Sequence, residues 1–156
     1  MARRLPLGLC ALLSVGPVLA DTSDTGERMS RAEQLKVFGA AGFSDQPTDC
    51  QLEAEHYENY RPVTMDVVKD LNGDGRLDAI ITEGSTLCCG FTGQGFFIVT
   101  KQADGEWRQV ASGEGIPQFL PHRGVDGWPD IEIAGPGTRR PVLRYDGNTY
   151  KLLPQP

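Results

Sequence analysis

The sequence contains only two histidines, His56 and His122. Neither lies in a Gly-x-Ser-x-Gly or a His-Glu-x-x-His segment, and no serine or cysteine is marked as an activated nucleophile beside a histidine. We therefore expect both to be surface or hydrogen-bonded residues, and we expect no enzymatic activity. The acidic cluster of Glu53, Glu55 and Glu58 has the residue type of a glycosidase acid/base pair, but it is more typical of a solvated face.

Positive charge is also scarce. The chain has 15 Lys and Arg against 21 Asp and Glu, for a formal net charge of −6. Without the N-terminal segment that contains Arg3 and Arg4, the remainder has 13 basic and 21 acidic residues, or −8. This charge disfavours nucleic acid and anionic membranes as partners. A cation, or a basic protein, is a better partner.

The chain has one long uncharged apolar run, from Leu5 to Leu19, directly after Arg3 and Arg4. A short basic start followed by such a run is the pattern of a secretory signal peptide. The run is too short to span a bilayer comfortably. It predicts Sec-dependent export to the periplasm or the medium, with no membrane insertion after cleavage.

Small residues define the expected cleavage point. Val18 and Ala20 occupy the third and first positions before a cut after Ala20. Residues 1–20 would be removed, residues 21–29 would form a flexible mature N-terminus, and residues 30–156 would form one domain. The mature chain of 136 residues is long enough for one core and short for two.

Three cysteines remain after cleavage, Cys50, Cys88 and Cys89. Thiols tend to pair in an oxidising compartment, and neighbouring cysteines rarely bridge each other. We expect a disulfide from Cys50 to either Cys88 or Cys89, closing a loop of roughly 40 residues and contributing about 3–4 kcal/mol. The third thiol would be a buried or exposed cysteine without a catalytic role. The three cysteines and His56 could in principle bind zinc, but their spacings match no zinc motif.

Ser30-Arg-Ala-Glu33 is a capping box, so a helix is expected over residues 31–41. Leu35, Phe38 and Ala41 recur at helical spacing and predict the apolar stripe by which this short helix docks.

The rest of the sequence predicts a mainly β (α+β) fold of antiparallel hairpins. Glycine and proline recur too often after Gly42 for another long helix. The expected strands are 63–69, 78–83, 95–101, 106–111, 130–134, 141–145 and 149–153. Asp104-Gly105 and Asp146-Gly147 are hairpin signals. An aromatic follows each turn, Trp107 or Tyr150, as though one unit were repeated.

Aromatic residues have two interpretations. Trp107, Trp128 and Tyr145 have the chemistry of a sugar-stacking platform, but in a β-rich domain aromatics usually fill the core, and we expect the core.

Residues 70 to 78, here called the acidic loop, read Asp-Leu-Asn-Gly-Asp-Gly-Arg-Leu-Asp. Four side chains at positions 1, 3, 5 and 9 offer oxygen donors, the ligands that calcium prefers: Asp70, Asn72, Asp74 and Asp78. Gly75 permits the sharp turn around an ion, and Arg76 would ligate through its carbonyl group. The alternative is an Asx-turn hairpin that closes without metal.

The acidic loop is not an EF-hand, because position 12 is Ile81 rather than glutamate and the flanking segments favour strands rather than helices. Between Val67 and Glu83 the sequence resembles the FG-GAP and VCBS repeats of integrin-like β-propellers and bacterial secreted proteins. The resemblance implies a calcium-binding loop between two strands and hairpins related to partial propeller blades. With one such loop, the chain is too short for a closed propeller. Residues 90–97 and 127–135 look like segments of small uncharacterised bacterial periplasmic proteins, which implies no named activity.

These features favour an exported calcium-binding β-rich binding module in which calcium has a structural role. The alternative is a periplasmic inhibitor or immunity protein for a basic enzyme such as a cell-wall hydrolase, which the acidic charge and the compartment favour. An enzyme that uses the acidic loop to position a substrate would need a nucleophile or base that the sequence does not mark.

Export gives the first testable prediction. Protein isolated from the producing cell should begin at Asp21 or within a residue or two of it, because Val18 and Ala20 precede the expected cut. N-terminal sequencing measures this directly. A mature protein that begins at Met1 or Ala2 would contradict it.

Overall fold

The fold is taken from a computed structural model, which describes residues 29–44, 56, 61–137 and 139–154. The elements in chain order are α1 (Arg31–Ala40), β1 (Arg61–Lys69), β2 (Asp78–Gly84), η2 (Gly90–Thr92), β3 (Gly95–Lys101), β4 (Trp107–Glu114), β5 (Ile116–Arg123), η3 (Val125–Gly127), β6 (Pro129–Ala134), β7 (Val142–Tyr145) and β8 (Tyr150–Leu152). No helix within these ranges is long and apolar enough to cross a membrane.

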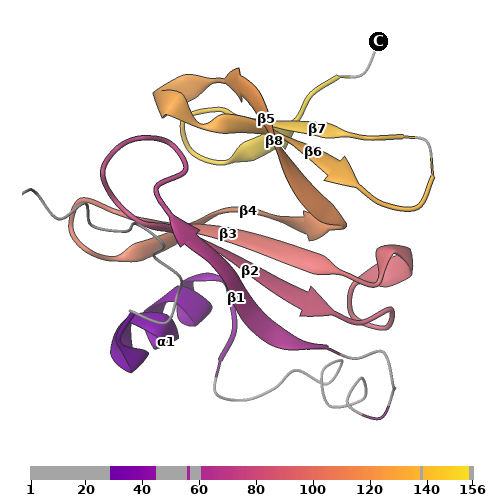
Figure 1. Ribbon diagram of the computed structural model, residues 1–156, viewed down its shortest axis with the longest axis horizontal. Helices are drawn as coiled ribbons and strands as arrows, with labels where there is room; N and C mark the ends of the chain where they lie inside the picture. The colour runs from indigo at the N-terminus through magenta and orange to yellow at the C-terminus, as the bar shows by residue number, and fades with distance from the viewer. Residues whose placement is uncertain (1–28, 45–55, 57–60, 138, 155–156) are drawn as a thin grey trace, which may run out of the picture.

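The strands form two four-stranded antiparallel sheets, each in simple chain order. Sheet A has the order β1-β2-β3-β4, and sheet B has the order β5-β6-β7-β8. Figure 1 shows three layers, with α1 on one face of sheet A and sheet B on the other. The expected mainly β fold with one short helix is therefore confirmed.

Sheet A is buried on both faces, so neighbouring residues along β2 and β3 enter different cores. The core between the sheets contains Leu71, Ile80, Phe96, Ile98, Val110, Ala111, Trp128, Ile131, Tyr145 and Tyr150. The core between sheet A and α1 contains Val37, Ala41, Val68, Ala79, Ile81, Val99 and Trp107. Burial on both faces explains why these strands read as nearly continuous apolar runs.

The capping box is only half formed. Ser30 Oγ accepts a hydrogen bond from the Glu33 backbone amide at 3.2 Å, as expected. The Glu33 side chain does not complete the box: its Oε1 accepts from Lys101 Nζ at 2.6 Å and from Trp107 Nε1 at 2.8 Å. A carboxylate that could serve the helix end locally instead fastens α1 to sheet A.

The predicted apolar stripe of α1 is partly wrong. Val37 is fully buried and Ala41 nearly so, whereas Leu35 is 54% exposed. Phe38 is only partly buried at the edge of the same core. The helix rests on sheet A through a narrower apolar contact than the spacing suggested, and the Glu33 bonds to Lys101 and Trp107 add to the attachment.

Both predicted hairpins are present, since β3 pairs with β4 and β7 pairs with β8. Trp107, Trp128 and Tyr145 are all buried, which confirms the core interpretation. The rings of Trp128 and Tyr145 lie 5.3 Å apart between the two sheets.

β5 is the strand that the sequence did not predict. It contains Pro117 and Pro121, and proline argues against a strand because it cannot donate to the ladder. The objection fails here because β5 lies at the edge of sheet B and pairs only with β6 among the described strands.

Gly115 lies where the chain passes from β4 in sheet A to β5 in sheet B. Its φ is +112°, and a Cβ at this position would lie 2.6 Å from Ile133 Cγ2 and 2.7 Å from the Ala134 carbonyl oxygen. Only glycine fits both the backbone conformation and the close approach.

Several expectations concern residues outside the described ranges: the signal peptide, most of the mature N-terminus, the cluster of Glu53, Glu55 and Glu58, and Cys50. Cys89 is a free, buried thiol, whereas Cys88 has an interaction of its own. The pairing of Cys50 stays a prediction, and the free Cys89 favours Cys88 as its partner. Burial raises the pKa of the Cys89 thiol, and the nearby charge of Glu83 raises it further, so the thiol is poorly reactive.

Gly115→Ala tests the corner between the sheets. Gly137→Ala is a matched control, because Gly137 has a similar φ of +111° and nothing within 4 Å of its Cβ position. Both variants bear the positive-φ cost of about 1–2 kcal/mol, and Gly115→Ala should lose a further 1–3 kcal/mol or so from overpacking. Chemical denaturation measures both; equal losses would show that the corner has room for a side chain.

Candidate metal site

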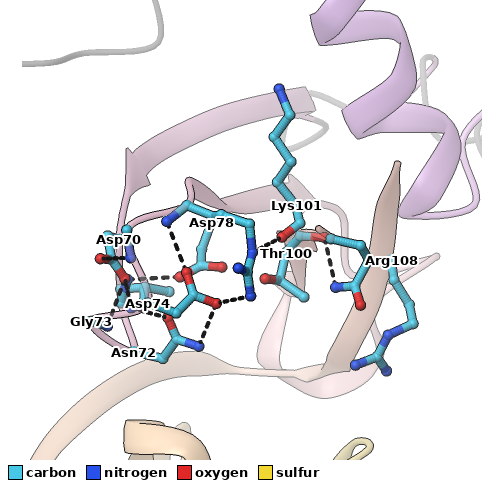
Figure 2. Close-up of polar contacts among 12 residues, drawn as sticks. Asp70, Asn72, Gly73, Asp74, Asp78, Thr100, Lys101 and Arg108 are labelled. Carbon is cyan, nitrogen blue, oxygen red and sulfur yellow. Dashed lines mark hydrogen bonds and ion pairs between the residues drawn. The ribbon is translucent and has the colours of Figure 1, made fainter. Parts of the chain in front are cut away.

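The acidic loop connects β1 to β2 and ends the hairpin that these strands form. Lys69 pairs with Asp78 at its base. The loop brings all five predicted ligands, Asp70, Asn72, Asp74, Arg76 and Asp78, into one turn, and Figure 2 shows the hydrogen bonds that close it.

Asp70 organises the first half of the loop. Its Oδ1 accepts from the Gly73 amide at 2.6 Å and from the Asp74 amide at 3.2 Å, and its Oδ2 accepts from the Gly75 amide at 2.8 Å. Slight burial acts to raise the pKa of the Asp70 carboxyl, but the amides of Gly75 and Gly73 outweigh it, and the pKa is lowered. Asp70 is therefore a charged oxygen donor with its backbone already folded around it.

Asp74 lies against a cation from its own loop. Its Oδ2 accepts from Arg76 Nη2 at 2.6 Å and from Asn72 Nδ2 at 3.1 Å, and its Oδ1 accepts from the Arg76 amide at 2.8 Å. Arg76 Nε also donates to the Lys101 carbonyl oxygen at 3.0 Å. The guanidinium thus partly neutralises the negative charge of the loop.

Asp78 differs from the other carboxylates because it is fully buried. Its Oδ2 accepts from the Leu71 amide at 2.7 Å, but its Oδ1 has no hydrogen-bond partner. Burial raises the pKa of the Asp78 carboxyl to about 6, and the charges of Asp74 and Asp70 add to the rise. The Leu71 amide lowers it, and so does the Thr100 hydroxyl, which lies near the carboxyl but makes no hydrogen bond of normal geometry to Oδ1. A buried carboxylate oxygen without a partner is costly.

Residues of sheet B contact the backbone of the acidic loop. Arg123 Nη1 donates to the Leu71 carbonyl oxygen at 2.8 Å and to the Gly127 carbonyl oxygen at 2.6 Å. A side chain at Gly127, whose φ is +75°, would collide with the carbonyl oxygen of Asn72. The loop is therefore clamped between β1–β2 and the β5–β6 connection.

A cavity of about 490 Å³ opens beside the acidic loop. Its lining includes Asn72, Asp74 and Arg76 from the loop, Thr100 from β3, and Asp126 from the β5–β6 connection. A second cavity, of about 570 Å³, has Leu35, Phe38, Phe43, Ser44 and Val63 as its described lining, and none of these residues carries a carboxylate.

The residues of the acidic loop have the oxygen donors that a calcium ion requires, but in this structure they make hydrogen bonds to one another. Within the described ranges, no three His, Cys, Asp or Glu side chains are arranged as a metal-binding group. Asp74 would have to give up Arg76 or Asn72 to become a ligand. Three carboxylates and an amide supply hard oxygen donors, and the unpartnered Oδ1 of Asp78 is a buried charge in need of a cation.

No motif in the sequence predicts the residues that surround the loop. Thr100, Arg123 and Gly127 lie 22 or more positions beyond Asp78 and belong to no motif with it. Pairing of β2 with β3 brings Thr100 alongside, and packing of sheet B brings the other two.

A second cluster of charge lies on sheet B. Asp130 is buried and accepts from Arg144 Nε at 2.9 Å and Arg144 Nη2 at 2.7 Å, while His122 Nδ1 lies 3.0 Å from Asp130 Oδ2. The bidentate guanidinium, more than the histidine, lowers the pKa of the Asp130 carboxyl. His122 is therefore hydrogen-bonded, as expected.

Comparison with family models, curated protein sequences and solved structures finds no match to this chain.

Asp78→Asn tests whether the buried carboxylate opposes folding without metal. An acid whose pKa is raised on folding binds more protons when folded, so metal-free stability should fall as pH rises from about 4 through about 6. The variant lacks this loss and should exceed the wild type at pH 7 by about 2–3 kcal/mol. Denaturation in chelator at pH 5 and pH 7 measures the difference. Asp104→Asn, in the exposed β3–β4 turn, is the control; parallel pH dependence of all three proteins would contradict the assignment.

Proposed function

We propose that this chain is an exported β-rich binding module whose acidic loop binds calcium, and that the ion has a structural role. The observation that carries the proposal is the fully buried Asp78, one carboxylate oxygen of which has no partner. Asp70 and Asp74 lie in the same turn and repel it. A divalent cation offsets this repulsion better than the single guanidinium of Arg76.

Calcium would be held by Asp70, Asn72, Asp74, the Arg76 carbonyl and Asp78. Bound there, it would supply positive charge to the carboxylates and fix the β1–β2 turn. Asp70 supports this role because three loop amides already fold around it. A site of this kind in an exported module needs only weak affinity, since extracellular modules bind calcium with Kd values of about 10⁻⁴–10⁻³ M.

The position of the loop supports a structural role rather than a catalytic one. Leu71 contributes to the core between the sheets, and its carbonyl oxygen receives Arg123 from β5. Ordering the loop therefore stabilises the contact between sheet A and sheet B. The two four-stranded meanders agree with the partial propeller blades that the FG-GAP and VCBS resemblance implies, and we include that relationship in the proposal.

A basic partner protein is the second candidate, as for an inhibitor or immunity protein. The specific observation in its favour is Phe91, which is 90% exposed in the connection between β2 and β3. Exposed aromatic side chains on acidic proteins suit anchoring in a partner's pocket.

Calcium should raise the melting temperature of the metal-stripped protein, because only the folded loop gathers the ligands. At about 100 times Kd the gain is about 2.7 kcal/mol, worth several degrees. Asp74→Ala should abolish this response and leave metal-free melting nearly unchanged, since relief of carboxylate repulsion offsets the lost Arg76 pair. Magnesium should substitute poorly, because it prefers a smaller octahedral shell.

Asp104→Ala is the matched control, because it removes a carboxylate from another turn, where Asp104 accepts from the Glu106 amide. This variant should keep the full calcium response. Calorimetric titration of wild-type protein that detects no calcium binding up to several millimolar would refute the proposed function.

A further inference from the structure

The acidic loop has a partial counterpart in sheet B. Asp74-Gly75-Arg-Leu-Asp78 leads into β2, and Asp126-Gly127-Trp-Pro-Asp130 leads into β6. Both segments read Asp-Gly-x-x-Asp, and the final aspartate of each is buried. Asp78 is fully buried, and Asp130 is 3% exposed.

The two aspartates also lie on corresponding faces of their sheets. Asp78 shares its face of β2 with Ile80, which enters the core between the sheets, so Asp78 is on the face of sheet A toward sheet B. Ile131 enters the same core, so its neighbour Asp130 is on the face of sheet B away from sheet A. The two sheets are thus stacked head to tail, which means that they have the same orientation and that opposite faces of the repeated unit meet between them.

The hairpins that follow obey the same correspondence. Trp107 pairs with Lys101 at the start of β4, and Tyr150 pairs with Tyr145 at the start of β8. Trp107 faces α1, and Tyr150 faces sheet A. The aromatic after each Asp-Gly turn therefore covers the same side of its sheet.

The residue opposite the buried aspartate differs between the two copies. Thr100 pairs with Asp78 across β2 and β3. The register of β6 and β7, in which Ile131 pairs with Leu143 and Glu132 with Val142, places Arg144 opposite Asp130. Thr100 and Arg144 are therefore equivalent residues, each opposite the buried aspartate of its sheet.

Charge compensation differs accordingly. Arg144 gives Asp130 a bidentate ion pair at 2.9 and 2.7 Å. Thr100 brings no charge to Asp78, whose Oδ1 remains without a partner. The copy with the internal guanidinium has also lost oxygen donors, since counting back from Asp130 puts His122 and Gly124 where the acidic loop has Asp70 and Asn72.

We propose that sheet B is a degenerate copy of the acidic-loop unit in which the Arg144 guanidinium takes the place of the ion, and that Thr100 keeps the first site open for calcium. The part concerning calcium rests on the proposed function. The identity of one cross-strand residue thus decides whether the buried aspartate is neutralised by metal or by protein.

Thr100→Arg should close the first site. Thr100 lines the cavity of about 490 Å³ beside the loop, which has room for the longer side chain. The new guanidinium would pair with Asp78 and repel the ion, so calcium affinity should fall at least about tenfold and metal-free melting should rise. Thr100→Val is the control: it removes the hydroxyl group without adding charge and should change calcium affinity less than about threefold. Calorimetric titration and metal-free melting of the three proteins provide the two readouts.

The reciprocal variant, Arg144→Thr, tests sheet B without overpacking. It should lower the melting temperature by leaving Asp130 buried without a cation, calcium should not restore it, and adding Asp130→Asn should recover part of the loss. Arg140→Thr is the control, because Arg140 makes a more exposed pair with Glu132 at 2.9 Å and should matter less.

The outcomes separate the two proposals. If wild type and Thr100→Arg bind calcium equally, or if Thr100→Arg melts below Thr100→Val without metal, this inference is wrong and the proposed function stands. If Arg144→Thr melts like wild type, or if Asp130→Asn brings no recovery, the equivalence of the two copies is wrong. If wild type binds no calcium, the proposed function is wrong, and so is the part of this inference that concerns calcium.

Discussion

The burial of one carboxylate, that of Asp78, governs the arrangement around it. Asp78 begins the central strand β2, pairs with β1 and β3, and accepts from the Leu71 amide through one oxygen. Leu71 in turn enters the core between the sheets and is held by Arg123. A charge in this position must be neutralised or stabilised by hydrogen bonds, because burial removes it from bulk solvent. The turn, the junction of the sheets and the candidate metal site all follow from how that requirement is met.

Head-to-tail stacking explains how the ends of the molecule are finished. Sheet A covers one face of sheet B, and helix α1 covers the corresponding face of sheet A (Figure 1). At the other end, the outer face of sheet B carries the ion pairs of Asp130 with Arg144 and of Glu132 with Arg140. One end is thus closed by an apolar contact and the other by charged groups that tolerate water, which ends the stack without a third sheet.

Much of the fold could be predicted from local signals in the sequence. The features that were not predicted correctly share one cause. Asp104-Gly105 and Asp146-Gly147 specify hairpins because turn geometry depends on adjacent residues. The edge position of β5, the exposure of Leu35 and the partners of Glu33 depend instead on which distant segment lies alongside. The prolines of β5 are compatible with a strand only at a sheet edge, and the sequence does not state which strands lie at an edge.

For the candidate site, the sequence by itself determined the donor set and the turn. Asp70, Asn72, Asp74 and Asp78 are spaced so that the backbone amides fold onto Asp70, an interaction confined to six consecutive residues. Only the tertiary structure decided that Asp78 is buried and that an uncharged residue, Thr100, lies opposite it on the neighbouring strand. It also decided that Arg144 occupies the equivalent position in sheet B. Hydrogen bonds within a turn are fixed by neighbours in the chain, whereas burial and charge compensation are fixed by strands that meet only when the sheets form.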